Sequence, residues 1–194
     1  MAKLKLGVLI SGRGSNLQSL IDACTNPDFP AEIVLVISNI PNVQGLERAQ
    51  KASIPTVTIN HKDFESRDAF DQALDAALCE ATVELVCLAG FMRIVTASFL
   101  EKWPHKVINI HPSLLPAFKG IHVHERVIEA GVKFSGCTVH RVVPEMDAGP
   151  IITQASVPVL DDDDADILAA RILEKEHVIY PLAVRLIAEE RKIG

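Results

Sequence analysis

Several features that mark specialised proteins are scarce in this sequence. No apolar run approaches the roughly 20 residues that a membrane-spanning helix needs, and the apolar start of the chain gives way at Ser11 to a glycine-rich stretch, too early for the core of a secretion signal. Basic residues are outnumbered, since 19 Lys and Arg oppose 25 Asp and Glu for a net charge of −6, which does not favour binding to a long polyanion. We therefore expect a soluble, cytoplasmic protein whose partners are neither membranes nor nucleic acids.

Cysteine is also scarce. Four cysteines occur in 194 residues, and no two of them form a Cys-x-x-Cys pair. That absence argues against a structural zinc site or a dithiol redox site. Cys87 and Cys137 lie in apolar, strand-like runs, so we expect the cysteines to be buried free thiols.

Two groups of potential metal ligands occur, and each has a simpler interpretation. The aspartates at 161–164 offer carboxylate oxygens, which suit hard cations, but Asp163 or Asp164 is also in place to cap the helix that follows. His122 and His124 lack Cys or acidic partners at the spacing typical of metal sites. No metal is expected.

The remaining composition, 48% hydrophobic and 23% charged residues, is that of an ordinary globular domain, and the length suits one domain. Apolar, strand-like runs alternate with segments of helical spacing, which favours a mainly parallel sheet covered by helices. The expected parallel strands span 4–10, 33–38, 56–59, 85–89 and 107–110. Helical spacing is clearest at Leu17, Leu20, Ile21 and Cys24, and again at Phe70, Leu74, Ala77 and Leu78.

The pattern changes after residue 130. Two further strands are expected at 137–143 and 150–159, joined by a short polar turn, which predicts an antiparallel extension of the sheet. The last segment, 165–191, has helical spacing, with a break or kink expected at Pro181.

A candidate reaction centre lies at the end of the fifth expected strand. Asn109 and His111 alternate on that strand and therefore face the same side, just before Pro112 ends it. An amide donor beside an imidazole suits a carbonyl that becomes an oxyanion, and the carboxylate of Asp147, in Met146-Asp147-Ala148-Gly149-Pro150, would fix the imidazole. The alternatives are an asparagine in a turn, a core histidine with satisfied hydrogen bonds and an aspartate in a turn.

A second motif, Ser11-Gly12-Arg13-Gly14-Ser15-Asn16, lies between the first strand and the first helix. Backbone N–H groups at such a turn bind anions, and a phosphate fits well. The motif lacks the Gly-Lys-Ser/Thr of a Walker A loop, and Leu17 replaces the third glycine of a dinucleotide fingerprint. The alternative is a plain strand-to-helix turn with Ser15 or Asn16 as the N-cap.

Together with Leu88–Ile94, Ser135–His140 and Glu176–Pro181, these motifs resemble those of the glycinamide ribonucleotide formyltransferases of purine biosynthesis, which use 10-formyltetrahydrofolate as formyl donor. The resemblance runs along the full chain. It implies a single formyltransferase domain over 1–194 with a Rossmann-like, mostly parallel twisted sheet, helices on its faces and an antiparallel C-terminal extension. The half up to about residue 105 would bind the nucleotide phosphate, and the half from about 106 would carry catalysis and folate binding.

The resemblance also implies roles for single residues. Asn109, His111 and Asp147 match the catalytic residues of the family. Gly14, Ser15 and Asn16 match its phosphate cradle, and Glu176 matches an acidic residue that contacts the ribonucleotide, although spacing alone suggests a surface helix residue there. The positions that match the folate site are Arg93, Ile94, Val95, Val142, Val143, Glu145, Met146 and Asp147.

Three further positions complete the comparison with the family. Thr138 and His140 match positions that support the catalytic aspartate. Arg141 stands where many relatives carry an aromatic or apolar residue, which implies a different outer wall of the folate site. Periodicity alone would place Ile94 and Val95 in the core.

Enzymes with other functions share the Asn, His and Asp that match Asn109, His111 and Asp147, and we call these three residues the trio. Methionyl-tRNA formyltransferases and formyltetrahydrofolate hydrolases also activate a formyl group, but the former carry an additional C-terminal domain and the latter an additional N-terminal one. This acidic chain ends at Gly194 without a basic region, and its first strand begins near residue 4. A nucleotide- or folate-binding module without activity would not need the trio. The expected partners are therefore the two small substrates, and the expected state is a monomer or homodimer.

Overall fold

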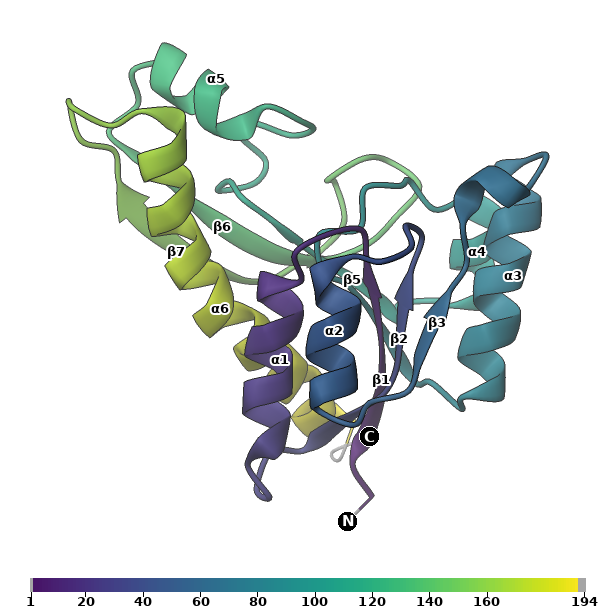
Figure 1. Cartoon of the computed structure of the whole chain (residues 1–194). Coiled ribbons are helices and arrows are strands. Elements are labelled where there is room, and N and C mark those ends of the chain that lie inside the picture. The colour runs from purple at the N-terminus through teal and green to yellow at the C-terminus, as the bar shows by residue number, and fades with distance from the viewer. Residues whose placement is uncertain (1, 192–194) are drawn as a thin grey trace.

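The computed structural model describes residues 2–191, and a seven-stranded mixed sheet with helices on both faces forms its centre (Figure 1). The strand order is β3-β2-β1-β4-β5-β6-β7. The first five strands pair in parallel, and β6 and β7 add antiparallel pairs at one edge. The predicted mainly parallel α/β sheet with an antiparallel extension is confirmed.

Most expected elements differ from the observed ones only at their ends. The strands are β1 (Leu4–Ile10), β2 (Ala31–Ser38), β3 (Thr56–Thr58), β4 (Leu85–Leu88), β5 (Val107–His111), β6 (Phe134–Arg141) and β7 (Ile151–Pro158). The helices are α1 (Ser15–Thr25), α2 (Gln44–Lys51), α3 (Arg67–Glu80), α4 (Ala97–Lys102), α5 (Val123–Glu129) and α6 (Ala165–Glu190), with a 3-10 turn, η1 (His61–Asp63).

Of the break or kink predicted at Pro181, the break is wrong, because α6 continues through it to Glu190. Proline removes one hydrogen bond of the helix. The buried face of α6 runs on both sides of Pro181, from Leu168 and Ile172 to Ala183 and Val184, and burial of this face outweighs the local preference of one residue. Within residues 2–191, no helix combines the length and the apolar character needed to cross a bilayer.

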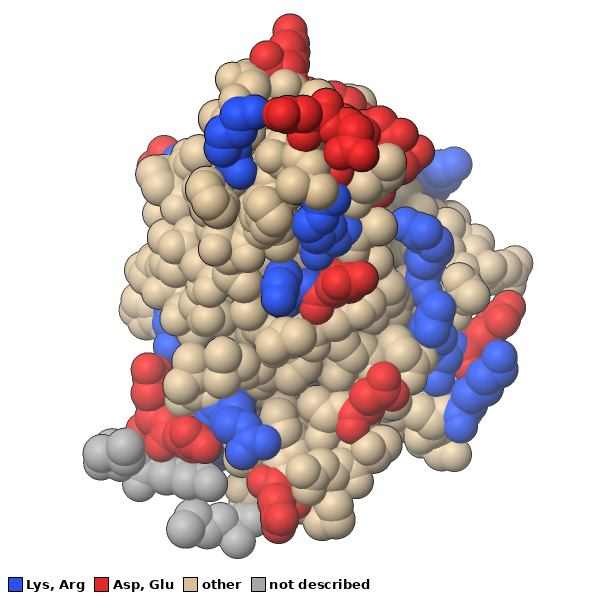
Figure 2. Space-filling view, turned by 90° about the vertical axis from the view of Figure 1, so that its left-hand side faces the viewer, with Lys and Arg blue, Asp and Glu red and all other residues tan. Residues whose placement is uncertain are grey.

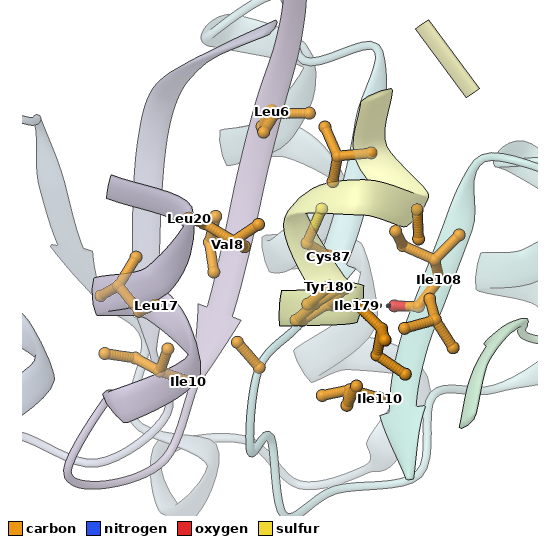
Figure 3. Close-up of a cluster of buried hydrophobic side chains, with 14 of the residues drawn as sticks. Leu6, Val8, Ile10, Leu17, Leu20, Cys87, Ile108, Ile110, Ile179 and Tyr180 are labelled. Carbon is orange, nitrogen blue, oxygen red and sulfur yellow. Dashed lines mark hydrogen bonds between the residues drawn. The ribbon is translucent and has the colours of Figure 1, made fainter. Parts of the chain in front are cut away.

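Each face of the sheet has its own apolar layer. Figure 3 shows one of them, in which Leu17 and Leu20 of α1 and Ile179 of α6 surround Val8 of β1. The fully buried Tyr180 extends this layer and donates its hydroxyl to the Leu88 carbonyl at 2.9 Å. These contacts fix α1 and α6 beside the ends of the central strands.

The cysteines are free, as expected, but not all are buried. Cys87 and Cys137 lie in the core, whereas Cys24 is half-buried and Cys79 is exposed. Burial raises the pKa of the Cys24 thiol to about 11. The expectation of burial was wrong for Cys79 because its position on α3 follows the last core-facing residue, Leu78.

The aspartates at 161–164 form caps and ion pairs. Asp164 is the N-cap of α6, and its Oδ1 accepts a hydrogen bond from the Ile167 N–H at 2.8 Å, which confirms that interpretation. Asp163 pairs with both terminal nitrogens of Arg171 at 2.5 and 2.7 Å. Figure 2, which shows the side of α6 and β7, has acidic side chains gathered at its upper end. Among residues 2–191, no group of three or more His, Cys, Asp or Glu side chains is arranged to hold a metal ion.

The sheet has a topological switch point between β1 and β4. From β1 the chain builds β2 and β3 on one side, and then returns to build β4 and β5 on the other. Ligands of open α/β sheets bind in the crevice at the carboxyl ends of strands where the order reverses. The glycine-rich turn after β1, the 89–96 segment after β4 and the end of β5 all lie at this edge.

Candidate active site

Strand pairing brings the predicted catalytic residues of β5 against β6. Asn109 lies opposite His140, and His111 lies opposite Thr138. Directly opposed residues of an antiparallel pair project from the same face, so all four side chains share one side of the sheet. His111, Thr138 and His140 are buried, whereas Asn109 is partly exposed.

The loop between β6 and β7 carries Asp147 to this group. Asp147 adopts a left-handed backbone conformation with φ 50°. Its Oδ2 accepts a hydrogen bond from the Gly120 N–H at 2.8 Å and lies 3.5 Å from His111 Nδ1. Its Oδ1 lies 3.7 Å from His140 Nε2. Asn109, His111, His140 and Asp147 therefore form one cluster, which we call the Asn-His-Asp cluster.

The two histidines of the cluster have different hydrogen-bond environments. His140 Nδ1 lies 3.0 Å from the Arg141 carbonyl and donates to it, so the neutral ring presents Nε2 as an acceptor to Asn109 Nδ2 at 3.4 Å. Burial lowers the pKa of His140. His111 has acceptors at both nitrogens, the Phe118 carbonyl at 3.0 Å from Nε2 and Asp147 at Nδ1. Two acceptors match the two donors of an imidazolium.

Thr138 supports the loop that follows β5. Its hydroxyl donates to the Ser113 carbonyl at 2.6 Å and accepts from the Leu115 N–H at 3.1 Å. Gln154 Nε2 adds a bond to the same oxygen at 2.9 Å. Thr138 thus positions the main chain that follows His111. Its side chain forms hydrogen bonds to this loop and not to Asp147.

Among the described residues, 2–191, no protein group binds the first N–H groups of α1 and no side chain caps this helix. Its N-cap is Gly14 with φ 69°, so the alternative of Ser15 or Asn16 as N-cap is wrong. A Cβ on Gly14 would lie 2.7 Å from the Gly45 Cα, so glycine is required there for space as well as for its backbone angle. Because the first-turn N–H groups of a helix have no partners within it, this turn is able to hold an anion.

Asn16 and Glu176 meet beside this turn although they are 160 positions apart in the chain. Asn16 Nδ2 donates to Glu176 Oε2 at 2.7 Å, and the two residues are 8% and 7% exposed. The alternative of a surface glutamate is therefore wrong. Burial raises the pKa of the Glu176 carboxyl, and the bond from Asn16 partly opposes that shift.

A pH prediction follows from Glu176. Its pKa in the folded state is raised above the ordinary 4.5, so the folded protein holds this proton more tightly than the unfolded chain. Stability that is present below pH 4.5 is lost as the pH rises through the raised pKa. Urea titrations at a series of pH values measure this effect. As the pH rises through the raised pKa of Glu176, we expect the unfolding free energy of the wild type to fall relative to that of Glu176→Gln. Parallel curves for the two proteins would contradict the assignment.

The 89–96 segment contains the positions matched to the folate site. Val95 is buried, as periodicity suggests, but Ile94 is 54% exposed and is not a core residue. Arg93 stacks its guanidinium over the Phe70 ring at 5.6 Å. Among residues 2–191, no hydrogen bond to another protein group involves the main chain of 93–95. Those peptide groups are free for a ligand.

The loop between β6 and β7 faces this segment through Val142, which packs against the apolar layer that includes Phe91 and Val95. The same loop holds Val143, which is half-buried, and Glu145 and Met146, which are exposed. Arg141 points elsewhere, since its guanidinium contacts the His105 carbonyl and Glu190. An apolar surface with free backbone groups nearby suits a flat heterocycle.

Sequence reasoning missed three groups that hold the site. The Gly120 N–H positions Asp147, the Phe118 carbonyl binds His111, and Asp71 of α3 accepts from the Thr96 N–H at 2.6 Å. The first two are main-chain groups, which leave no signal in side-chain type. Asp71, a charged residue on the apolar face of a helix, was a signal that periodicity analysis could have used.

Known proteins resemble this chain along nearly its whole length. Residues 4–184 match the formyl transferase family. Phosphoribosylglycinamide formyltransferase of Haemophilus influenzae is 44% identical over 96% of this chain and 88% of its own. The trifunctional purine biosynthetic protein adenosine-3 of Gallus gallus is 53% identical over 96% of this chain, which spans only 18% of that longer protein.

A solved structure agrees with these sequence matches. Glycinamide ribonucleotide transformylase 1 from Symbiobacterium toebii superposes with a TM-score of 0.95 at 48% identity, over 97% of this chain and 89% of that one. The expected family resemblance is confirmed, and the chain belongs to the formyl transferase family.

Proposed function

We propose that this protein transfers the formyl group of 10-formyltetrahydrofolate to the amine of glycinamide ribonucleotide, and releases formylglycinamide ribonucleotide and tetrahydrofolate. The proposal is supported by the relatives named for this activity. The single observation that carries it is the Asn-His-Asp cluster, which lies at the same sheet edge as a helix N-terminus suited to a phosphate and a segment with free peptide groups. The reaction belongs to biosynthesis in the cytoplasm and needs no metal.

The chemistry follows from the residue types in the cluster. The neutral amine of the ribonucleotide, with an ordinary pKa of about 8 for such a group, attacks the formyl carbon, and its carbonyl oxygen becomes an oxyanion. Asn109 Nδ2 and the His111 imidazolium stabilise that oxygen. The bond from the formyl carbon to folate N10 then breaks, while the proton lost by the amine passes to N10 with the help of Asp147, through water.

The contacts of His111 define what the substrate must replace. Both ring nitrogens already face acceptors, the Phe118 carbonyl and the Asp147 carboxylate. A developing oxyanion that receives a hydrogen bond from His111 therefore takes the place of one of them. Because charge-assisted bonds are the stronger ones, this exchange becomes favourable only as negative charge grows on the oxygen. That is the differential stabilisation that accelerates a reaction.

The two substrates would occupy opposite sides of the cluster. Gly14, Ser15 and Asn16 bind the phosphate of the ribonucleotide, and Glu176, held by Asn16, contacts its polar groups. The folate lies between the free peptide groups of Arg93–Val95 and the loop that carries Val142, Val143, Glu145, Met146 and Asp147. His140 and Thr138 hold Asn109 and the loop after β5 in place. The proposed active form is a monomer or a homodimer.

The first experiment measures tetrahydrofolate release from 10-formyltetrahydrofolate, with and without glycinamide ribonucleotide, by wild type and Asp147→Asn. We expect release that requires the ribonucleotide and falls at least about 10²-fold in the variant, because a neutral amide cannot stabilise the imidazolium or carry the proton. Equal release without the ribonucleotide would indicate a hydrolase. Folate binding without release would indicate a binding module. Transfer to methionyl-tRNA in place of the ribonucleotide would indicate the tRNA enzyme.

A further inference from the structure

One buried hydroxyl joins the turn after β1 to the segment after β4. Ser11 Oγ accepts a hydrogen bond from the Met92 N–H at 2.8 Å. The same oxygen lies 2.5 Å from Asn39 Oδ1, at the end of β2. Ser11 is 7% exposed and Asn39 is 1% exposed, so water does not compete for these bonds.

The two bonds of Ser11 have opposite directions. Met92 N–H is a donor only, so Ser11 Oγ accepts from it and directs its single hydrogen to Asn39 Oδ1. The other side of Asn39 faces His61, whose Nδ1 lies 3.1 Å from the Asn39 amide nitrogen and 3.0 Å from the Asn39 main-chain carbonyl. The main-chain N–H of Asn39 also donates to the Ile10 carbonyl at 3.4 Å. These contacts hold Asn39 beside Ser11.

The bond from Met92 is the main-chain anchor in the middle of the 89–96 segment. The ends of the segment are tied by the Ala89 N–H to the Leu9 carbonyl at 2.9 Å and by the Thr96 N–H to Asp71 at 2.6 Å. Within residues 2–191, the Met92 N–H is the one main-chain group between these ends that bonds to another protein group. Gly90, with φ 74° and open space around it, adds no restraint there.

We propose that Ser11, oriented by Asn39, is a positioning residue for the folate. It fixes the peptide plane between Phe91 and Met92, one residue before Arg93, and so restrains the direction of the free peptide groups of Arg93–Val95. Without this bond the segment between Ala89 and Thr96 keeps the packing of Phe91 and Val95 but loses its central main-chain restraint, and its peptide groups are less well preorganised for a flat ring. The inference rests on the proposed function, since it concerns the same folate site.

Steady-state kinetics of the full chain test the inference. We expect Ser11→Ala to raise KM for 10-formyltetrahydrofolate about three- to tenfold, which is the factor for the loss of one hydrogen bond. KM for glycinamide ribonucleotide should stay within about twofold of wild type, since the phosphate cradle begins at Gly14 and its N–H groups are untouched. Ser38→Ala is the matched control, because Ser38 is a buried serine at the adjacent strand end whose hydroxyl, within the part of the chain that the structure describes, bonds only to the Ile40 main chain.

A second pair of variants separates positioning from stability. Asn39→Leu removes the acceptor for Ser11, whereas Asn39→Asp keeps an oxygen there at the expense of a buried charge. We expect Asn39→Leu to raise the folate KM as Ser11→Ala does, and Asn39→Asp to restore it even with a lower Tm. A merely structural role would instead make the folate KM follow the Tm.

The possible failures are distinguishable. A wild-type protein without formyl transfer to the ribonucleotide overturns the proposed function, and the inference with it. A wild type that transfers the formyl group, with an unchanged folate KM in Ser11→Ala and Asn39→Leu, overturns the inference alone. A rise confined to the ribonucleotide KM also overturns it, and would assign Ser11 to the nucleotide turn.

Discussion

Replacing Asn109 with alanine is expected to lower kcat for formyl transfer about 10²- to 10³-fold, which is the usual effect of losing one oxyanion donor. The Asn109 side chain is partly exposed, and its one hydrogen bond to a protein group within residues 2–191 is the long one to His140 at 3.4 Å. Its removal therefore costs little folding free energy, on the order of 1 kcal/mol or less. The measurement is kcat with both substrates saturating, beside a urea unfolding curve.

Asn26→Ala provides the control for this prediction. Asn26 is an exposed asparagine after α1 whose Oδ1 accepts from the Asp28 N–H at 2.9 Å. The Asn26→Ala variant should keep the wild-type kcat although it loses the hydrogen bond to the Asp28 N–H, which is comparable to the bond lost in Asn109→Ala. A kcat for Asn109→Ala within threefold of wild type would remove Asn109 from the oxyanion site, and a large fall in unfolding free energy would assign it a structural role.

Part of the site could be predicted from the sequence because it follows local rules. Alternation on one strand placed Asn109 and His111 on the same face, whereas His140 was matched only through the family resemblance and its position opposite Asn109 comes from the strand pairing. The glycines between β1 and α1 also followed a local rule. In this kind of fold the turn from the first strand to the first helix brings backbone N–H groups to the helix N-terminus, where an anion binds. These features depend on neighbours in the chain or on strand periodicity.

The rest depends on contacts between distant parts of the chain. The burial of Glu176 against Asn16 across 160 positions cannot be read from the spacing of α6, which by itself suggests an exposed residue. Pro181 behaves likewise, because local preference predicts an interruption and the buried face of α6 overrides it. Ser11 has no local sign of its role, since its partners Met92 and Asn39 come from two other strand ends.

The conformation of Asp147 depends on tight contact between its loop and β6. Gly149, two residues after Asp147, is buried against the end of that strand, and a Cβ there would lie 1.8 Å from the Arg141 carbonyl oxygen. Backbone atoms cannot yield at such a distance as a flexible side chain would. The nearby bond from the Arg141 N–H to the Pro150 carbonyl, at 2.9 Å, holds the two ends of the loop together at this point.

Gly149→Ala is therefore expected to displace the loop and lower kcat about 10²-fold, since a shift of roughly 1 Å in a catalytic group has effects of that size. The displaced Asp147 loses its 2.8 Å bond from the Gly120 N–H and its 3.5 Å contact with His111. Gly131→Ala is the matched control, because Gly131 has φ 65° but open space around it. The strain in Gly131→Ala, about 1 kcal/mol, lowers the Tm without moving the Asn-His-Asp cluster, so kcat should stay at the wild-type value. Equal kcat losses in the two variants would attribute the effect to stability, whereas a loss confined to Gly149→Ala would show that close packing of this loop holds the carboxylate where proton transfer needs it.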